Sequence, residues 1–479
     1  MTTSTLAATP SALATPRGRL VLVLLCAVGF LDFVDATIVN VALPAIRDDL
    51  GFSVQELQWV PSGYLLTYGG FMLLGGRAAD MLGRKRMLLA GIVVFGISSL
   101  VGGFADSSAV LVGSRLAQGV GGAMTLPATL SLLTTTFTDG PDRHKALGVW
   151  AGVGGLASAV GVLAGGLLTE GPGWRWVMFI NPVICVLLLP AIARLIPRDE
   201  PAAERAGFDL TGAFLATAGM LVLVYGLVEA PDEGWGSART VGALVLAGVL
   251  LLGFLVNETR HRNPLMPLSI FRVRGLGAAN ATQLIAFAGF LAMFFFLTLY
   301  MQNVLGYTPI ETGLAYLPVC VVIGVSAGVA TQLIAKVGTR PLVVIGGVVA
   351  AAGIALFSQI SVGGSYVGDL LPGMVVMSLG MGAVFVAVIN GANAGVPAEQ
   401  AGLAAALLNS SQQVGGALGL AVLSAIATSL TNDRLESGAL PPDALVHGFQ
   451  RGLLVGSIFM LAGALIGLRT PQTHELSDG

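Results

Sequence analysis

Apolar blocks of about 20 residues, separated by short polar breaks, run through the chain from residue 19 almost to its end. An α-helix rises 1.5 Å per residue, so about 20 residues cross the roughly 30 Å of hydrocarbon in a bilayer. Of the 479 residues 55% are hydrophobic and 10% are charged, whereas a soluble domain carries about 25% charged residues. The sequence therefore predicts an all-α membrane protein.

Fourteen of these blocks are long enough to be spanning helices. We place them at 19–44, 56–76, 86–104, 109–134, 145–169, 174–195, 209–229, 239–257, 275–301, 311–335, 340–358, 369–391, 402–428 and 449–468. With both termini in the cytoplasm, 18 of the 24 Lys and Arg residues fall on the cytoplasmic side, five fall outside and one lies within a span. Because cytoplasmic loops are enriched in Lys and Arg, we expect a multi-pass protein of the cytoplasmic membrane with both termini inside.

Two short loop sequences recur at an offset of 255 residues. Leu50-Gly51-Phe52-Ser53 is matched by Leu305-Gly306-Tyr307-Thr308. Gly83, which precedes Arg84-Lys85, is matched by Gly338, which precedes Thr339-Arg340. The shared offset predicts two duplicated six-helix halves, a construction found in many secondary transporters with the site at their interface. The expected organisation is a disordered cytoplasmic tail (1–18), an N-terminal bundle (19–195), a cytoplasmic linker (196–208), two inserted helices (209–257), a second cytoplasmic linker (258–274), a C-terminal bundle (275–468) and a cytoplasmic tail (469–479).

Asp32, Asp35 and Arg115 are charged residues placed well inside predicted spans. A charge at the bilayer centre costs about 2.5–3.5 kcal/mol or more, so it needs a partner or a wet cavity. Helical rise puts Asp35 at roughly 22 Å and Arg115 at roughly 21 Å from the cytoplasmic boundary. We expect these two side chains to face each other, with Asp32 toward the cavity. The pair is either a structural ion pair or the proton-coupling group, and in the second case Asp32 is the aspartate that titrates.

Several segments resemble the major facilitator superfamily, and more closely its fourteen-helix drug:proton antiporter branch. The stretch Asp35-Ala36-Thr37-Ile38-Val39-Asn40-Val41-Ala42-Leu43-Pro44 is similar to the helix 1 signature of that branch. Arg115-Leu116-Ala117-Gln118-Gly119 resembles the helix 4 motif, and the resemblance implies a role for its arginine in proton transfer. Trp174-Arg175-Trp176 through Asn181-Pro182 resembles the entry to helix 6.

A further stretch, Gly76-Arg77-Ala78-Ala79-Asp80-Met81-Leu82-Gly83-Arg84-Lys85, resembles the loop 2–3 motif of the superfamily. The resemblance implies a cytoplasmic gate made by Gly76, Asp80, Gly83 and Arg84. Gly83 suits a tight turn, and we expect Asp80 just beyond the end of the second helix, where it can pair with Arg84. The alternative interpretation is an ordinary positive-inside anchor.

The fifth predicted helix carries small residues at helix-packing spacing. The pairs Gly148–Gly152 and Gly161–Gly165 have the GxxxG spacing that permits close approach of helices. Gly161-Val162-Leu163-Ala164-Gly165-Gly166 resembles the exporter motif of the family, with Val162 where the family usually has proline.

The second half carries no counterpart of the intramembrane charges, since position 370, which is 255 beyond Arg115, is a leucine. It offers amides and aromatic rings, which suit amphipathic organic molecules better than sugars or inorganic ions. The candidate substrate-binding residues are Phe294, Tyr300, Gln302, Asn390, Asn393, Asn409 and Gln412.

These features together predict a monomeric antiporter, driven by the proton gradient without a cofactor, that exports hydrophobic or cationic drugs. The alternatives are an exporter of an endogenous metabolite, and a channel or uptake symporter. No Gly-Lys dipeptide occurs, so a Walker-A phosphate loop is excluded. Gly324-Val325-Ser326-Ala327-Gly328 matches GxSxG but lies within a predicted helix, so we expect no enzyme activity. We expect no metal site and no nucleic-acid partner either.

Overall fold

The computed structural model describes residues 12–137, 140–197, 209–273, 275–393, 396 and 400–470. Within them the chain forms fourteen long helices. These are α1 (Pro16–Leu50), α3 (Trp59–Leu82), α4 (Arg84–Gly103), α5 (Ser108–Thr136), α6 (Gly140–Glu170), α7 (Arg175–Leu195), α8 (Leu210–Glu233), α9 (Ala238–Arg260), α10 (Leu276–Asn303), α11 (Pro309–Val337), α12 (Thr339–Leu356), α13 (Leu371–Asn393), α14 (Ala401–Glu436) and α15 (Pro441–Gly467). The all-α architecture and the fourteen helices agree with the prediction from sequence.

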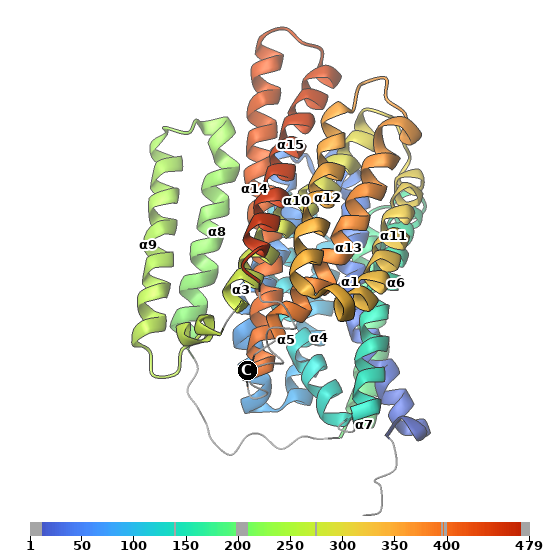
Figure 1. Cartoon of the computed structure of the whole chain (residues 1–479). Helices are drawn as coiled ribbons and strands as arrows, with labels where there is room; N and C mark the ends of the chain where they lie inside the picture. Colours follow the sequence, from blue (N-terminus) through green and yellow to red (C-terminus); the bar gives the residue numbers. More distant parts are fainter. Residues whose placement is uncertain are drawn as a thin grey trace, which may run out of the picture.

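In the described part of the chain, thirteen helices are long and apolar enough to cross a membrane. The remaining long helix, α3, is not among them, but it packs closely against α5 and α14 inside the bundle (Figure 1). A helix shielded by protein needs less apolar surface than one that faces lipid. A single turn, α2 (Val54–Leu57), precedes α3.

The predicted duplication is visible in backbone geometry. Gly51 and Gly306 follow α1 and α10 with φ of 71° and 74°, which glycine adopts without steric cost. The next residue pairs then form the same capping box: the side chains of Ser53 with Glu56, and of Thr308 with Glu311, exchange hydrogen bonds with each other's backbone N–H. Equivalent turns 255 residues apart therefore precede equivalent helix starts, which lead into the single turn α2 in the first half and into α11 in the second.

The inserted helices α8 and α9 form an antiparallel hairpin beside the bundle (Figure 1). Helix α8 packs against α14 and α3, so it contacts both halves. At the foot of the hairpin, Asn257 donates a 2.7 Å hydrogen bond to Asp209, and the Met266 N–H donates one of 2.8 Å to Glu258. The linker that follows is anchored by Arg77, which donates to the carbonyls of Asn263 and Pro264.

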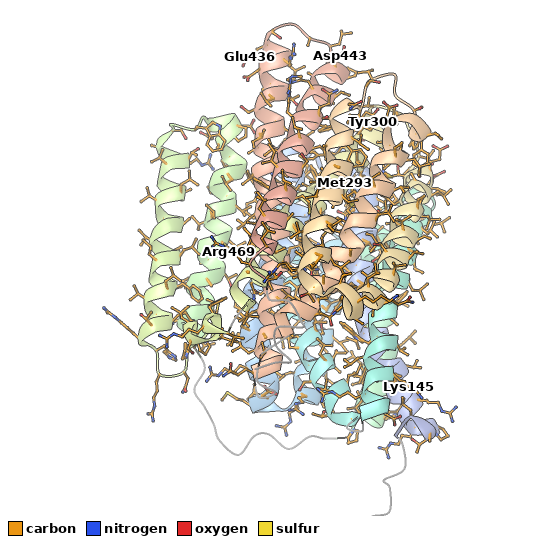
Figure 2. All side chains as sticks on the ribbon, viewed as in Figure 1. Lys145, Met293, Tyr300, Glu436, Asp443 and Arg469 are labelled. Carbon is orange, nitrogen blue, oxygen red and sulfur yellow. The ribbon has the colours of Figure 1, made fainter. Side chains whose placement is uncertain are left out.

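The two ends of the bundle are distinguished by their turns. We call the end with the Gly83 and Gly338 turns the basic end, because Arg84, Lys85 and Arg340 follow these turns. The end with the Gly51 and Gly306 turns is called the opposite end. Figure 2 shows Lys145 toward the basic end and Glu436 with Asp443 at the opposite end.

Some predicted boundaries are wrong. Helix α3 continues to Leu82, so Asp80 lies in its last turn rather than beyond its end. Helix α15 begins at Pro441, eight residues before the predicted start at 449, because Pro441 and Pro442 fit a helix start where no N–H partner is needed. Most of the predicted linker 196–208 and of both tails lies outside the described residues.

Candidate functional site

The charged residues predicted inside the first and fourth spans meet in the structure. Arg115 on α5 donates from Nη1 to Oδ2 of Asp35 on α1 at 2.7 Å, and the two side chains are 1% and 0% exposed. Burying both charges costs several kcal/mol per ion unless they are paired and hydrogen-bonded further. The predicted contact between Asp35 and Arg115 is therefore confirmed.

Two buried amides complete the coordination of Asp35. Oδ1 accepts hydrogen bonds from Gln118 Nε2 at 2.8 Å and from Asn181 Nδ2 at 2.6 Å. Gln118 lies on α5 three residues after Arg115 and also accepts from Arg115 Nη1 at 2.7 Å. Asp35 thus receives three donors and offers none, which is the arrangement that an ionised carboxylate satisfies.

The guanidinium of Arg115 has further partners on α3. Its Nε donates to the Val60 carbonyl oxygen at 3.2 Å, and its Cζ lies 4.3 Å from the centroid of the Tyr64 ring. A cation at this distance over an aromatic face is stabilised by the ring. The network therefore joins α1, α3, α5 and α7 within the N-terminal half.

Asn181 extends the network to α4. Its Nδ2 also donates to Ser99 Oγ at 3.0 Å, and Ser99 in turn donates to the Met178 carbonyl oxygen at 2.8 Å. The Oδ1 atom of Asn181 is buried and has no hydrogen-bond partner among the described residues. Sequence reasoning did not select Gln118 or Asn181. The helical spacing of Gln118 from Arg115 was the signal that could have identified it.

Asp32 lies one turn from Asp35 on α1 and is 5% exposed. Its Oδ2 accepts a hydrogen bond from Thr125 Oγ1 of α5 at 3.1 Å. No ion pair involves Asp32 in the described part of the chain, in contrast to Asp35. The two aspartates therefore have different electrostatic surroundings: one is bound to a cation and one is held by a hydroxyl.

The predicted gate residues lie around the turn between α3 and α4. Gly83 has φ of 99°, and Arg84 Nη2 lies 3.5 Å from Asp80 Oδ1 across it. Gly76 packs against Pro127 of α5. Lys85 Nζ donates to the carbonyls of Ala193 and Ile196 at 2.7 and 2.5 Å, which holds the end of α7 to the same turn.

The glycines predicted to mediate packing on α6 divide into two pairs. An added Cβ would lie 3.0 Å from the Val34 carbonyl oxygen at Gly161 and 2.6 Å from that of Ile38 at Gly165, so α1 approaches α6 closely there. Around Gly148 and Gly152 an added Cβ meets nothing within 4 Å. The structure therefore corrects the packing prediction for Gly148 and Gly152, which face open space.

The candidate substrate residues of the C-terminal half have separate partners in the structure. Tyr300 is fully buried and donates to the Ser361 carbonyl at 2.6 Å, while Asn390 and Asn409 each donate to a carbonyl of their own helix. Phe294 packs against Tyr316 at 5.0 Å between ring centroids. The side chain of Asn393 lies outside the described residues.

Two of the amide candidates have partners across helices. Gln412 on α14 accepts a hydrogen bond from Gln283 on α10 at 2.7 Å. Gln302 donates to the Val41 carbonyl of α1 at 2.9 Å. Gln302 therefore connects the two halves through one N–H of its amide group.

Other polar contacts also join the halves at the opposite end. Arg47 Nη2 lies 3.4 Å from Asn303 Oδ1. Glu170 accepts a hydrogen bond from the Ile310 N–H in the first turn of α11 at 3.2 Å, where a carboxylate also complements the helix dipole. Nearer mid-height, Ser410 Oγ donates to the Gly69 carbonyl oxygen at 2.6 Å. Two helical halves that contact each other at one end and near mid-height, with a buried charge network in the first half, define a membrane transporter.

Comparison with known proteins gives the family. The model of the Major Facilitator Superfamily matches residues 25–420, and the chain belongs to that superfamily. The chain is 39% identical to the puromycin resistance protein pur8 of Streptomyces alboniger, over 96% of this chain and 93% of that protein. It is also 39% identical to the cephamycin export protein CmcT of Amycolatopsis lactamdurans, over 93% and 91%.

Solved structures agree on the fold. A bacterial homologue of the human lysosomal transporter Spinster, in an inward-facing and occupied conformation, superposes with a TM-score of 0.65. The match covers 95% of this chain and 98% of the other at 17% sequence identity. Members of this superfamily are transporters and not enzymes.

Proposed function

We propose that this protein is a monomeric proton-coupled antiporter that exports hydrophobic or cationic organic molecules, including antibiotics, across the cytoplasmic membrane by alternating access. The proposal of proton coupling rests on the buried pair of Asp35 and Arg115. Charged residues inside the membrane are costly to bury and generally have a functional role. The names of the relatives, a resistance protein and an export protein for two antibiotics, support the substrate class.

Proton binding at Asp35 would reorganise the network. The ionised carboxylate already uses Arg115, Gln118 and Asn181 as donors. A protonated carboxyl is itself a donor and requires an acceptor. Rotation of the Asn181 amide would supply one, since its Oδ1 has no other partner among the described residues. The proton would then weaken the attraction to Arg115 and loosen α1 from α5.

Asp32 is the second place where the proton can reside. A buried carboxylate without a cation is costly, and Thr125 contributes a neutral hydroxyl only. Binding of a proton removes that cost, whereas binding of a cationic substrate provides the missing charge. Exchange of a proton for a cation at Asp32 would then change the electrostatic environment of Asp35, one helical turn away.

The contacts between the halves indicate how access would alternate. We assign the basic end to the cytoplasm because of the positive-inside rule. The contacts of Val41 with Gln302 and of Glu170 with α11 then hold the outer end closed. Outward opening requires their release, while the Asp80–Arg84 turn is the gate on the cytoplasmic side. The energy comes from the proton gradient, without a cofactor or metal.

The test is efflux driven by an imposed proton gradient in everted vesicles with a panel of dyes and antibiotics. The wild-type protein should transport several hydrophobic cations, and Asp35→Asn should lose gradient-driven transport. Asp32→Asn should lose the pH dependence while the protein remains folded. Transport that persists unchanged in Asp35→Asn would refute the coupling proposal, and accumulation in the reverse direction would favour a symporter.

A second candidate is export of a natural product made by the same cell. It is favoured by the names of relatives that export cephamycin and tetracenomycin C. Both candidates use the same site and mechanism. A narrow substrate range, in which one compound class competes with all transported dyes at much lower concentration, would favour the dedicated exporter.

A further inference from the structure

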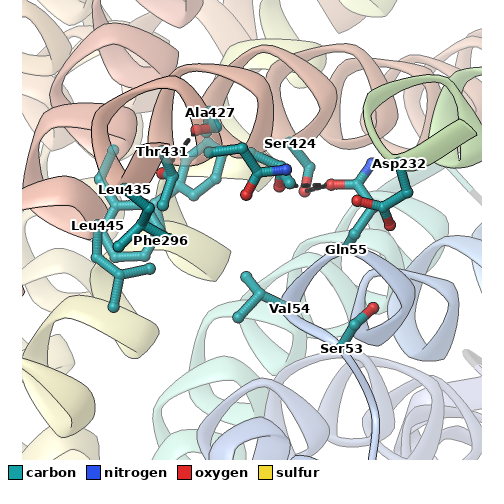
Figure 3. A pocket seen from close by; sticks show the side chains of 13 residues that line it. Ser53, Val54, Gln55, Asp232, Phe296, Ser424, Ala427, Thr431, Leu435 and Leu445 are labelled. Carbon is teal, nitrogen blue, oxygen red and sulfur yellow. Dashed lines mark hydrogen bonds between the residues drawn. The ribbon is translucent and has the colours of Figure 1, made fainter. Parts of the chain in front are cut away.

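A cavity of about 240 Å³ lies at the opposite end, where both halves meet the inserted hairpin. It is separate from the Asp35 network and shares no residue with it. The walls come from the turn before α3, from α8, from α10, and from α14 and α15 (Figure 3). The cavity therefore exists only where the inserted hairpin docks onto the two halves.

One wall of the cavity is apolar. Phe296 and Phe449 stand with ring centroids 5.5 Å apart, and Leu435, Leu445 and Ala427 adjoin them. Thr431 also lines the cavity, but its hydroxyl donates to the carbonyls of Ala427 and Ala444 and is already satisfied. This wall suits a hydrocarbon or aromatic body.

The facing wall carries a carboxylate. Asp232 lines the cavity from the last turn of α8 and is exposed, as Figure 3 shows beside Gln55. The neighbouring cation, Arg239, pairs with Glu233 at 2.7 Å and with Glu229 at 3.6 Å. We find no ion pair on Asp232 among the described residues, so its charge is available to a ligand.

Gln55 lines the cavity and also contacts the parts of the transporter that would separate on opening. This side chain is 2% exposed. Its Nε2 donates to the Val228 carbonyl of α8 at 3.0 Å, and its Oε1 accepts from Thr428 of α14 at 2.6 Å. One amide thus holds the N-terminal half to the hairpin and to the C-terminal half. Movement of the halves apart at this end must break these contacts and open the cavity wall.

We propose that this cavity binds a small organic cation with an apolar body, and that occupancy holds the transporter closed at the opposite end. The ammonium group lies beside Asp232 and the apolar body lies against Phe296 and Phe449. The site is distinct from the transport site and regulates the cycle by slowing opening. It also gives the inserted helices a function, because α8 supplies the carboxylate.

Benzyltrimethylammonium is a suitable probe, because it combines one aromatic ring with a permanent charge. Binding is measured by equilibrium dialysis of the labelled compound with the full-length protein in phosphatidylglycerol nanodiscs, where no lipid cation competes. We expect saturable binding that Asp232→Asn weakens about two- to fivefold, as for an exposed ion pair. Asp106→Asn, which changes an exposed carboxylate at the same end outside the cavity, is the matched control and should bind normally.

A second variant blocks the cavity without touching its buried wall. Leu435 is 42% exposed, so Leu435→Trp should fold and should abolish binding by filling the space. Binding of unchanged affinity in both Leu435→Trp and Asp232→Asn would overturn the proposal, as would no saturable binding to the wild-type protein. Equal binding of the neutral isostere neopentylbenzene would exclude the role of Asp232. Loss of binding in phosphatidylcholine nanodiscs would assign the site to lipid headgroups instead.

The regulatory claim is tested separately from the proposed transport mechanism. The probe should inhibit dye efflux in the wild-type protein without competing with the dye, and Leu435→Trp should resist it. Competitive inhibition that is unchanged in Leu435→Trp would mean that the probe acts at the transport site, and the regulatory claim would fail. Binding to the cavity should persist in Asp35→Asn, so failure of proton coupling and failure of this proposal give different results.

Discussion

Neutralising the two charges of the central pair, singly and together, is the most direct test of the network. The Arg115 guanidinium is 1% exposed and also contacts Gln118 Oε1 and the Val60 carbonyl, and Asp35→Asn should leave these two contacts in place. Removing one member of a buried pair costs about 3–5 kcal/mol. These remaining contacts place Asp35→Asn near the lower limit, about 3 kcal/mol in the free energy of unfolding.

Arg115→Gln leaves the Asp35 carboxylate with two neutral amide donors, Gln118 and Asn181, and should cost about 3–5 kcal/mol as well. The double variant buries no charge. Because neutral replacement of a buried pair is often close to neutral in stability, it should be less destabilised than the sum of the single variants by at least about 2 kcal/mol.

The assay is a double-mutant cycle on the free energy of unfolding in denaturant, with transport measured on the same samples. Single variants that add to within about 0.5 kcal/mol would refute the energetic reasoning, since residues in direct contact should couple. Gradient-driven efflux that remains intact in the double variant would refute the proposed mechanism even if the stability result holds.

Three further perturbations give distinct readouts. Gly161→Ala should destabilise the protein in thermal melts because its Cβ would press on α1, whereas Gly152→Ala, in open space on the same helix, should be neutral or stabilising by up to about 1 kcal/mol. Gly83→Ala should cost about 1–2 kcal/mol, since φ of 99° strains any residue with a Cβ; unchanged melting would contradict this. Gln55→Leu leaves the Val228 carbonyl and the Thr428 hydroxyl without their partner, so cysteine pairs across the opposite end should crosslink more slowly than in the wild-type protein.

The transmembrane architecture follows largely from the chain itself. A spanning helix is determined by its own segment of sequence, because in lipid every backbone polar group must form its hydrogen bond within that segment. Length and apolarity of the blocks therefore sufficed to predict fourteen helices, although α3 is less apolar than the others and the limits of α3 and α15 were misplaced. The repeat at offset 255 was readable for the same reason, since a glycine turn and the capping box after it depend on adjacent residues.

The contact of Asp35 with Arg115 was also predictable, because the cost of burying charge requires a partner and helical rise gives the depth of each residue. The remaining members of the network were not. Asn181 and Ser99 are polar residues in apolar helices, and their positions along the chain do not reveal which of them face Asp35.

Tertiary structure alone decided which amides contact which helix. Gln302 donates a hydrogen bond from one half to the other, and Gln55 joins both halves to the inserted hairpin. Nothing in the sequence around either residue indicates these contacts. Gly148 and Gly161 carry the same spacing signal, yet one faces open space and the other faces α1. The rotation of a helix about its axis and the choice of its neighbours depend on packing of the whole bundle, and no local pattern encodes them.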